Sequence, residues 1–183
     1  MHIRPLDPVS DRALVDAFFV EATDYIFLER DELPGPDVTE EFFTDTPPGC
    51  DPATSLRIGL FKDGHLIAVG ETAFGYPEPH DAYLGLMIVS PRARGTGAGS
   101  FLLRHIEAEA LARQKKNLYL AVLDANPRGQ SFWEREGEAI AKRNLWISVP
   151  ALFLAFAIWQ VWSVVAVSLP GLGFKYSTNQ LFW

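Results

Sequence analysis

Apolar and polar positions alternate in two neighbouring stretches of the chain that a tight turn connects. Residues 56–61 alternate as a half-buried strand does, and residues 66–74 return as a second, largely apolar strand. Lys62, Asp63 and Gly64 separate the two stretches, and Asp-Gly is the strongest short signal for a hairpin turn. The pattern therefore predicts two antiparallel strands.

The same reading gives the other elements of residues 1–137. Strands are predicted over 2–6, 56–61, 66–74, 82–89 and 117–123. Apolar residues at helical spacing predict helices over 11–23 and 37–43, a helix that ends near 114, and a helix over 127–136. The order β-α-α-β-β-β-α-β-α belongs to the α+β class, with a mixed sheet and helices packed against it.

The hydropathy pattern changes abruptly after Arg143. Residues 144–174 contain no charged side chain, and 145–169 are rich in Leu, Val, Ala, Phe, Ile and Trp. A helix that spans a bilayer needs about 20 apolar residues. We therefore predict a transmembrane-type helix over 145–169 in preference to a buried core helix. Lys142 and Arg143 precede it, which places its N-terminal side in the cytoplasm.

Charge and cysteine content narrow the functions of the first part. The formal net charge of the chain is −7. Residues 138–183 have a net charge of +2, so residues 1–137 have a net charge of −9. An acidic domain is a poor binder of nucleic acid, and we expect no such partner. Cys50 is the single cysteine, which excludes an internal disulfide. No His, Cys and carboxylate spacing suggests a metal site.

A glycine-rich stretch over 86–104 carries the clearest chemical signal. An apolar strand ends at Val89, and glycines follow at positions 95, 97 and 99 before a helical pattern begins. Glycine lets a ligand approach the backbone closely. The first N–H groups of a helix have no intrahelical partner, and the helix dipole adds about half a positive charge there. The stretch therefore predicts a phosphate-binding site.

This stretch resembles the acetyl-CoA signature of the GNAT N-acetyltransferases. Their pattern is Arg or Gln, two residues, Gly, one residue, then Gly or Ala, and Arg94, Gly97 and Gly99 match it. The stretch 126–137, Asn-Pro-Arg-Gly-Gln-Ser-Phe-Trp-Glu-Arg-Glu-Gly, is similar to the second motif of the family. The resemblance covers residues 1 to about 137.

The resemblance implies acetyl-CoA as a cosubstrate and direct attack of an amine on its thioester in a ternary complex. It implies that loop amides bind the pyrophosphate, that the strand backbone binds the pantetheine, and that an Asn adds a contact. The residues so implied are Met87, Ile88, Val89, Arg94, Gly95, Thr96, Gly97, Ala98, Gly99, Ser100 and Asn126.

Two positions depart from the catalytic pattern of the family. Trp133 stands where many members place an acidic Tyr, and Ala121 stands where ribosomal-protein acetyltransferases place a Glu base. An indole N–H is not a useful acid. Glu71 is our candidate for a replacement base, because burial in its apolar strand would raise its pKa. A solvent-facing Glu71 is the alternative, and Tyr25 and Tyr83 are further candidates.

The chain continues with Glu-Ala-Ile-Ala-Lys-Arg-Asn-Leu-Trp-Ile-Ser-Val-Pro over 138–150 and ends with Ser-Thr-Asn-Gln-Leu-Phe-Trp over 177–183. With these stretches, residues from about 132 to 183 resemble the first membrane helix of a second family, the nitrate/nitrite porters of the major facilitator superfamily. The GNAT sheet ends in two more strands beyond Gly137, whereas here the porter-like stretch follows. We therefore expect a C-terminally truncated GNAT domain over 1–137. Residues 138–183 would hold a porter-like membrane span that arose by a fusion.

Three functions remain open. The first is an acetyl-CoA-dependent N-acetyltransferase that acts on a small molecule or a terminal amine. The second is a catalytically impaired, membrane-tethered acyl-CoA-binding module, and the third is a transporter fragment with an incidental soluble head. The N-terminus lacks a signal-type apolar core. We expect a cytoplasmic domain that 145–169 tethers to the inner membrane.

Overall fold

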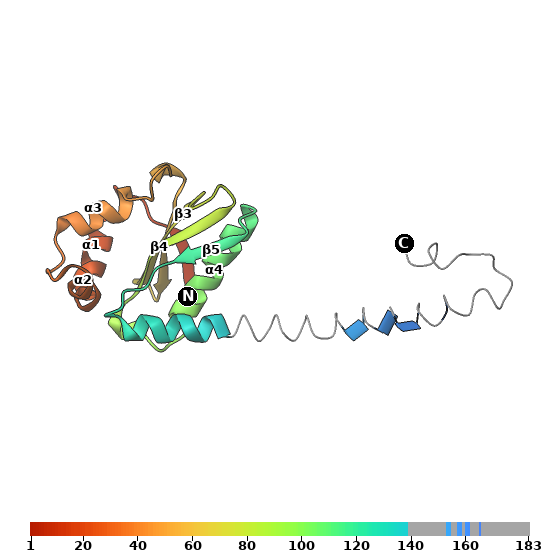
Figure 1. Ribbon diagram of the computed structural model, residues 1–183. Helices are drawn as coiled ribbons and strands as arrows, with labels where there is room; N and C mark the ends of the chain where they lie inside the picture. Colours follow the sequence, from red (N-terminus) through yellow and green to blue (C-terminus); the bar gives the residue numbers. More distant parts are fainter. Residues whose placement is uncertain (139–152, 155–156, 159, 162–164, 166–183) are drawn as a thin grey trace. The chain divides into compact units, whose positions relative to one another are not determined.

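The computed structural model describes residues 1–138, 153–154, 157–158, 160–161 and 165 (Figure 1). The chain divides into a first unit, residues 1–130, and a second unit, residues 131–183. The elements of the first unit are β1 (His2–Pro5), α1 (Arg12–Glu21), α2 (Thr23–Arg30), α3 (Pro36–Thr44), β2 (Leu56–Lys62), β3 (His65–Phe74), β4 (Asp81–Val89), α4 (Ala98–Ala112) and β5 (Asn117–Leu120). A further helix runs over 127–138.

The strands form one five-stranded sheet in the order β1-β2-β3-β4-β5. The first three pairs are antiparallel, and β4 and β5 are parallel. This confirms the predicted mixed sheet, in which most of the pairs are antiparallel. Asp63 and Gly64 both have positive φ, which is the backbone of the tight turn expected between β2 and β3. Within the described residues β5 has a strand on one side only.

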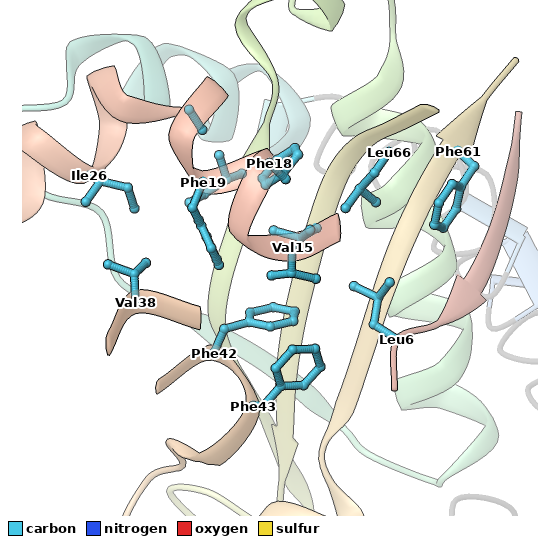
Figure 2. Packing of buried hydrophobic residues seen from close by; sticks show 13 residues of the cluster. Leu6, Val15, Phe18, Phe19, Ile26, Val38, Phe42, Phe43, Phe61 and Leu66 are labelled. Carbon is cyan, nitrogen blue, oxygen red and sulfur yellow. The ribbon is translucent and has the colours of Figure 1, made fainter. Parts of the chain in front are cut away.

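Helices cover both faces of the sheet in the first unit. The side chain of Val69 belongs to a core with α1 and α3, which Figure 2 shows between those helices and the strands. The next residue, Gly70, faces the opposite way, because a Cβ there would lie 3.2 Å from Ile106 of α4. The core on the side of α1 and α3 consists of Leu6, Val15, Phe18, Phe19, Ala22, Ile26, Val38, Phe42, Phe43, Phe61, Leu66, Val69 and Ile88.

The segment before α3 differs from the prediction. A single helix over 11–23 was expected, but α1 ends at Glu21 and a separate helix, α2, begins at Thr23. The chain turns at Ala22, where ψ is 23°. The Thr23 hydroxyl donates to the carbonyl of Val20, which stabilises the break. The predicted helix therefore corresponds to α1, and α2 had no counterpart in the prediction.

The predicted membrane helix over 145–169 lies mostly outside the described residues, as does most of the porter-like stretch. Among the described residues, no helix combines the length and apolar character that crossing a bilayer requires.

A partly buried ion pair ties β1 to the start of α1. The Asp11 carboxylate accepts two hydrogen bonds from the Arg4 guanidinium, both 2.7 Å long, and one of 2.9 Å from the Asp7 N–H. The Arg4 hydrogen bonds lower the pKa of Asp11 from 3.8 to about 2. Because the pKa is depressed in the folded state, this stabilisation is present above about pH 4 and is lost as the pH falls through 2.

Replacing Asp11 by Asn tests this linkage. Arg4 is partly exposed, so we expect Asp11→Asn to lower the free energy of unfolding by only about 1 kcal/mol at pH 7. The difference from the wild type should shrink at pH 2, where the wild-type carboxyl is half protonated. Urea unfolding at the two pH values measures it, and an equal loss at both would contradict the ion-pair account.

Candidate functional site

A cavity of about 450 Å³ opens between the helices α1 to α3 and the strands β3 and β4. Its wall combines apolar and acidic side chains with two tyrosines. The lining residues are Phe19, Ile26, Glu29, Arg30, Val38, Glu41, Phe42, Asp45, Thr46, Pro47, Pro48, Glu71, Tyr76, Tyr83, Gly85 and Leu86. The predicted base, Glu71, is therefore in the wall of a cavity and not on an open surface.

The Glu71 carboxyl is buried without a full set of hydrogen bonds. Its residue is 6% exposed, and Oε1 has no partner. Burial raises the pKa of Glu71 from 4.5 to about 7, and the positive charge of Arg57 opposes the rise. Of the two placements that the sequence left open for Glu71, the structure shows the buried one, with the pKa shifted upwards as burial implies. A carboxyl with a pKa near 7 in a cavity can accept a proton at neutral pH.

Arg57 lies directly opposite Glu71 in the pairing of β2 and β3. Its guanidinium donates to three backbone carbonyls, those of Phe42 at 2.7 Å, Pro52 at 2.6 Å and Asp45 at 3.0 Å. Arg57 thus fixes the chain after α3 against the sheet, and its charge acts on Glu71 through space.

A bulge in β4 makes room for the Glu71 side chain. Glu71 is paired with Leu86 and Thr72 with Leu84, so Gly85 is an extra residue in β4. A Cβ on Gly85 would lie 2.3 Å from Glu71 Oε2. The carboxyl therefore occupies the space that a side chain at position 85 would need.

Gly85→Ala is expected to displace the Glu71 carboxyl and to lower kcat of any reaction that uses it, by about tenfold or more. The affinity for pyrophosphate alone, which would contact only the glycine-rich loop, should change little, because Gly85 lies outside that loop. Steady-state kinetics and ligand titration separate the two effects. An unchanged kcat in a folded variant would contradict the placement of Glu71 in the reaction.

The strands β4 and β5 are paired only at one end. Their parallel register runs from Asp81 and Asn117 to Leu84 and Leu120. Among the described residues, 85–89 of β4 therefore have a strand neighbour only in β3. The open edge of β4 begins beside the cavity. Free backbone N–H and C=O groups on such an edge can bind an extended ligand.

The register distinguishes the three predicted residues of this edge. The Ser90 N–H donates to the Ile67 carbonyl, and hydrogen-bonded pairs recur at every second residue of an antiparallel ladder. The backbone of Ile88 therefore faces β3, and the backbones of Met87 and Val89 face the open edge. Of these, the Val89 carbonyl accepts a hydrogen bond from the Arg94 side chain.

The glycine-rich loop has the geometry that anion binding requires. Gly95 and Gly97 have φ of 76° and 85°, and a Cβ on either would meet nothing within 4 Å. The hydrogen bond from the Phe101 N–H to the Gly97 carbonyl closes the first turn of α4. Residues 98–100 belong to this first turn, and the first N–H groups of a helix have no acceptor within the helix. The Thr96 hydroxyl donates within the loop, to the carbonyl of Ala93 at 2.7 Å.

The Arg94 side chain is held by α2, which sequence reasoning missed. Its guanidinium forms a bidentate pair with the Asp24 carboxylate, 2.8 Å in one of the two bonds. Arg128 lies 3.7 Å from the same carboxylate. The hydrogen bonds from Arg94 are the main cause of a lowered pKa of Asp24, and the charge of Arg128 lowers it further. Asp24 thus connects α2, the glycine-rich loop and the start of the helix over 127–138. Asp24 and Arg94 are 70 residues apart in the chain, and no sequence pattern indicates their contact.

The remaining predicted residues fall in different places. Asn126 precedes the helix over 127–138, where its side-chain oxygen accepts a hydrogen bond from the Gly129 N–H at 2.9 Å.

Tyr83 lines the cavity, with its ring 5.5 Å from that of Tyr76. Tyr25 does not line it, and burial raises its pKa to about 12. Trp133 belongs to the second unit, where its ring packs edge-on against Phe132.

Comparison with known proteins gives two kinds of relative. The model of the acetyltransferase (GNAT) family matches residues 19–137. The crystal structure of an acetyltransferase from Thermus thermophilus has a TM-score of 0.63 and 25% identity, over 74% of this chain and 84% of that one. The ribosomal-protein-alanine N-acetyltransferase of Brucella melitensis biovar Abortus 2308 has a TM-score of 0.57 and 19% identity, over 74% and 90%, which shows the fold alone.

A different relative is the nitrate/nitrite transporter NarU of Salmonella typhimurium. It is 48% identical over 73 residues, which are 39% of this chain and 16% of the transporter. The resemblance to a porter fragment is therefore confirmed, and the chain spans only a small part of that relative. A match of 73 residues is longer than 132–183, so it reaches into residues that the acetyltransferase model also matches.

Proposed function

Because the chain belongs to the acetyltransferase (GNAT) family, we propose that it transfers the acetyl group of acetyl-CoA to an amine, by direct attack in a ternary complex. The observation that carries this proposal is the unpartnered carboxyl of Glu71, buried in a cavity beside the open edge of β4. A base placed next to an unpaired strand edge is what amine acetylation requires.

The cosubstrate site that we propose fits three features of the chain. Met87 and Val89 expose backbone N–H groups on the open edge, where an extended pantetheine can pair. Backbone N–H groups within 95–100 would donate to a pyrophosphate, apart from that of Thr96, which donates to the Ala93 carbonyl at 3.4 Å. Gly95 and Gly97 leave the space above the loop open. Acetyl-CoA would supply an activated thioester carbonyl there. Ile88 supports this edge through its buried side chain, and Asn126 remains a proposed contact.

We assign proton removal to Glu71. An acceptor amine enters as an ammonium ion, which cannot attack a carbonyl. The pKa near 7 leaves about half of the Glu71 carboxyls ionised at neutral pH. Ser55 and the Gly85 N–H help to lower this pKa, but Oε1 itself accepts no hydrogen bond in the described structure. The proton therefore passes from the ammonium to this oxygen. Tyr76 and Tyr83 line the same cavity, and we assign the proton donor for the leaving thiolate to the hydroxyl of one of them.

The alternative is a membrane-tethered module that binds acyl-CoA without catalysis. Among the described residues β5 is an edge strand, whereas the sheet of the family continues beyond this strand. This difference favours the binding module without catalysis. In either case we propose a truncated acetyltransferase domain over 1–137, located in the cytoplasm. Residues 138–183 would be a porter-derived segment joined by fusion, with 145–169 as a membrane tether.

Thiol release by the full chain separates these functions. With acetyl-CoA and a mixture of primary amines, the acetyltransferase should release CoA thiol only when an amine is present. Binding of acetyl-CoA in a calorimeter without amine-dependent thiol release would support the binding module. The absence of both binding and release would contradict both proposals.

A further inference from the structure

We propose that the acceptor is an aliphatic diamine or polyamine, with its reactive amine at Glu71 and a second ammonium group at Glu29 and Asp45. This inference rests on the proposed acetyltransferase function and specifies its substrate class. It follows from the charge, the depth and the lining of the cavity between α1 to α3 and the sheet.

The cavity has an excess of negative charge. Among its lining residues are four carboxylates, on Glu29, Glu41, Asp45 and Glu71, and a single cationic side chain, on Arg30. Arg30 already pairs with Glu41 and, at 3.2 Å, with Asp37 of α3. Within the described part of the chain, Glu29 and Asp45 form no ion pair of their own. Arg30 acts on Glu29 and Arg57 on Asp45 through space, but neither carboxylate is held in a contact ion pair by a described residue, so both can accept a cation.

The carboxylates lie at two depths. Glu71 is buried, whereas Glu29 and Asp45 are exposed and line the same cavity. The wall also carries apolar side chains, from Phe19, Ile26, Val38, Phe42 and Leu86. An alkyl chain can pack against that wall, while charged groups at its two ends meet carboxylates. A diamine has this distribution of charge.

The unpartnered Glu71 oxygen is an independent sign of a cationic ligand. Buried polar atoms nearly always have a hydrogen-bond partner, and Oε1 of Glu71 has none although its residue is 6% exposed. An ammonium group supplies the missing donor with the matching charge. An acceptor with a free carboxylate would instead face the charge of Glu29 and Asp45, which disfavours it.

Three amines of equal chain length test the inference on the full chain. We expect kcat/KM for 1,5-diaminopentane to exceed that for pentylamine by about tenfold or more, since a hydrogen bond to a charged group has this effect. The value for 5-aminopentanoate should be the lowest of the three. The double variant Glu29→Gln and Asp45→Asn should bring the diamine close to the monoamine. Glu32→Gln, an exposed carboxylate outside the cavity, should leave the ratio unchanged.

Equal kcat/KM for the diamine and the monoamine would overturn the substrate class and leave the acetyltransferase standing. A diamine preference that survives in the double variant would overturn the assignment of Glu29 and Asp45. If no amine releases thiol, the proposed function fails, and calorimetric titration of the diamine decides the inference. Binding that is lost in the double variant would support it, and no binding to the wild type would overturn it.

Discussion

Glu71→Gln is expected to lower kcat/KM for amine acetylation by about 10²- to 10³-fold, the usual effect of removing a general base. The wild type should also lose activity as the pH falls through about 7, the pKa of the buried carboxyl, because only the ionised form accepts a proton. The variant should lack this decline. A pH profile of kcat/KM from pH 5 to 9 measures both effects.

Stability separates a catalytic Glu71 from a structural one. A carboxyl whose pKa is raised by burial destabilises the folded state above its unfolded pKa of about 4.5. Glu71→Gln removes that charge, so the variant should unfold at the same or a higher temperature at pH 8. A variant that melts well below the wild type, or that keeps the decline near pH 7, would contradict the assignment of the base.

Gly97→Ala is expected to weaken acetyl-CoA binding by more than about tenfold. Gly97 is the residue before α4 and has φ of 85°, a conformation that alanine adopts at a cost of about 1 to 2 kcal/mol. Relief of that strain would turn the first N–H groups of α4 away from the ligand, and the new methyl group would occupy the open space above them. Calorimetric titration with acetyl-CoA measures the change.

Gly64→Ala is the matched control. Gly64 has φ of 80°, also meets nothing within 4 Å, and lies in the turn between β2 and β3. Gly64→Ala should lose about as much stability as Gly97→Ala, and it should keep the wild-type affinity for acetyl-CoA. Equal acetyl-CoA affinities of the two variants would show that the glycine-rich loop is not the anion site.

Local patterns predicted the parts of the fold that short stretches of sequence determine. The strand alternation and the Asp63-Gly64 turn depend on neighbouring residues, and both appear as expected. The burial of Glu71 was one of the two placements that the sequence left open, and the apolar residues around it in its strand were the reason to consider it. The open space at Gly95 and Gly97 also followed from residue type, because glycine has no Cβ.

Features that depend on tertiary packing were not predicted. The cavity exists because α2 and α3 pack beside the sheet, and the sequence pattern predicted no helix where α2 lies. The bulge at Gly85 is a property of two paired strands. The contact of Asp24 with Arg94 joins distant residues, and neither the spacing nor the composition of the chain indicates it.

Hydrogen exchange of the full chain with and without acetyl-CoA tests the central claim most directly, namely that the open edge of β4 and the glycine-rich loop bind the cosubstrate next to Glu71. The account predicts slower exchange of backbone amides in 85–89 and 95–100 when acetyl-CoA is added, with little change in the turn at 62–65. Saturating acetyl-CoA that leaves both segments unprotected, or that protects the sheet only at β1 and β2, would contradict it.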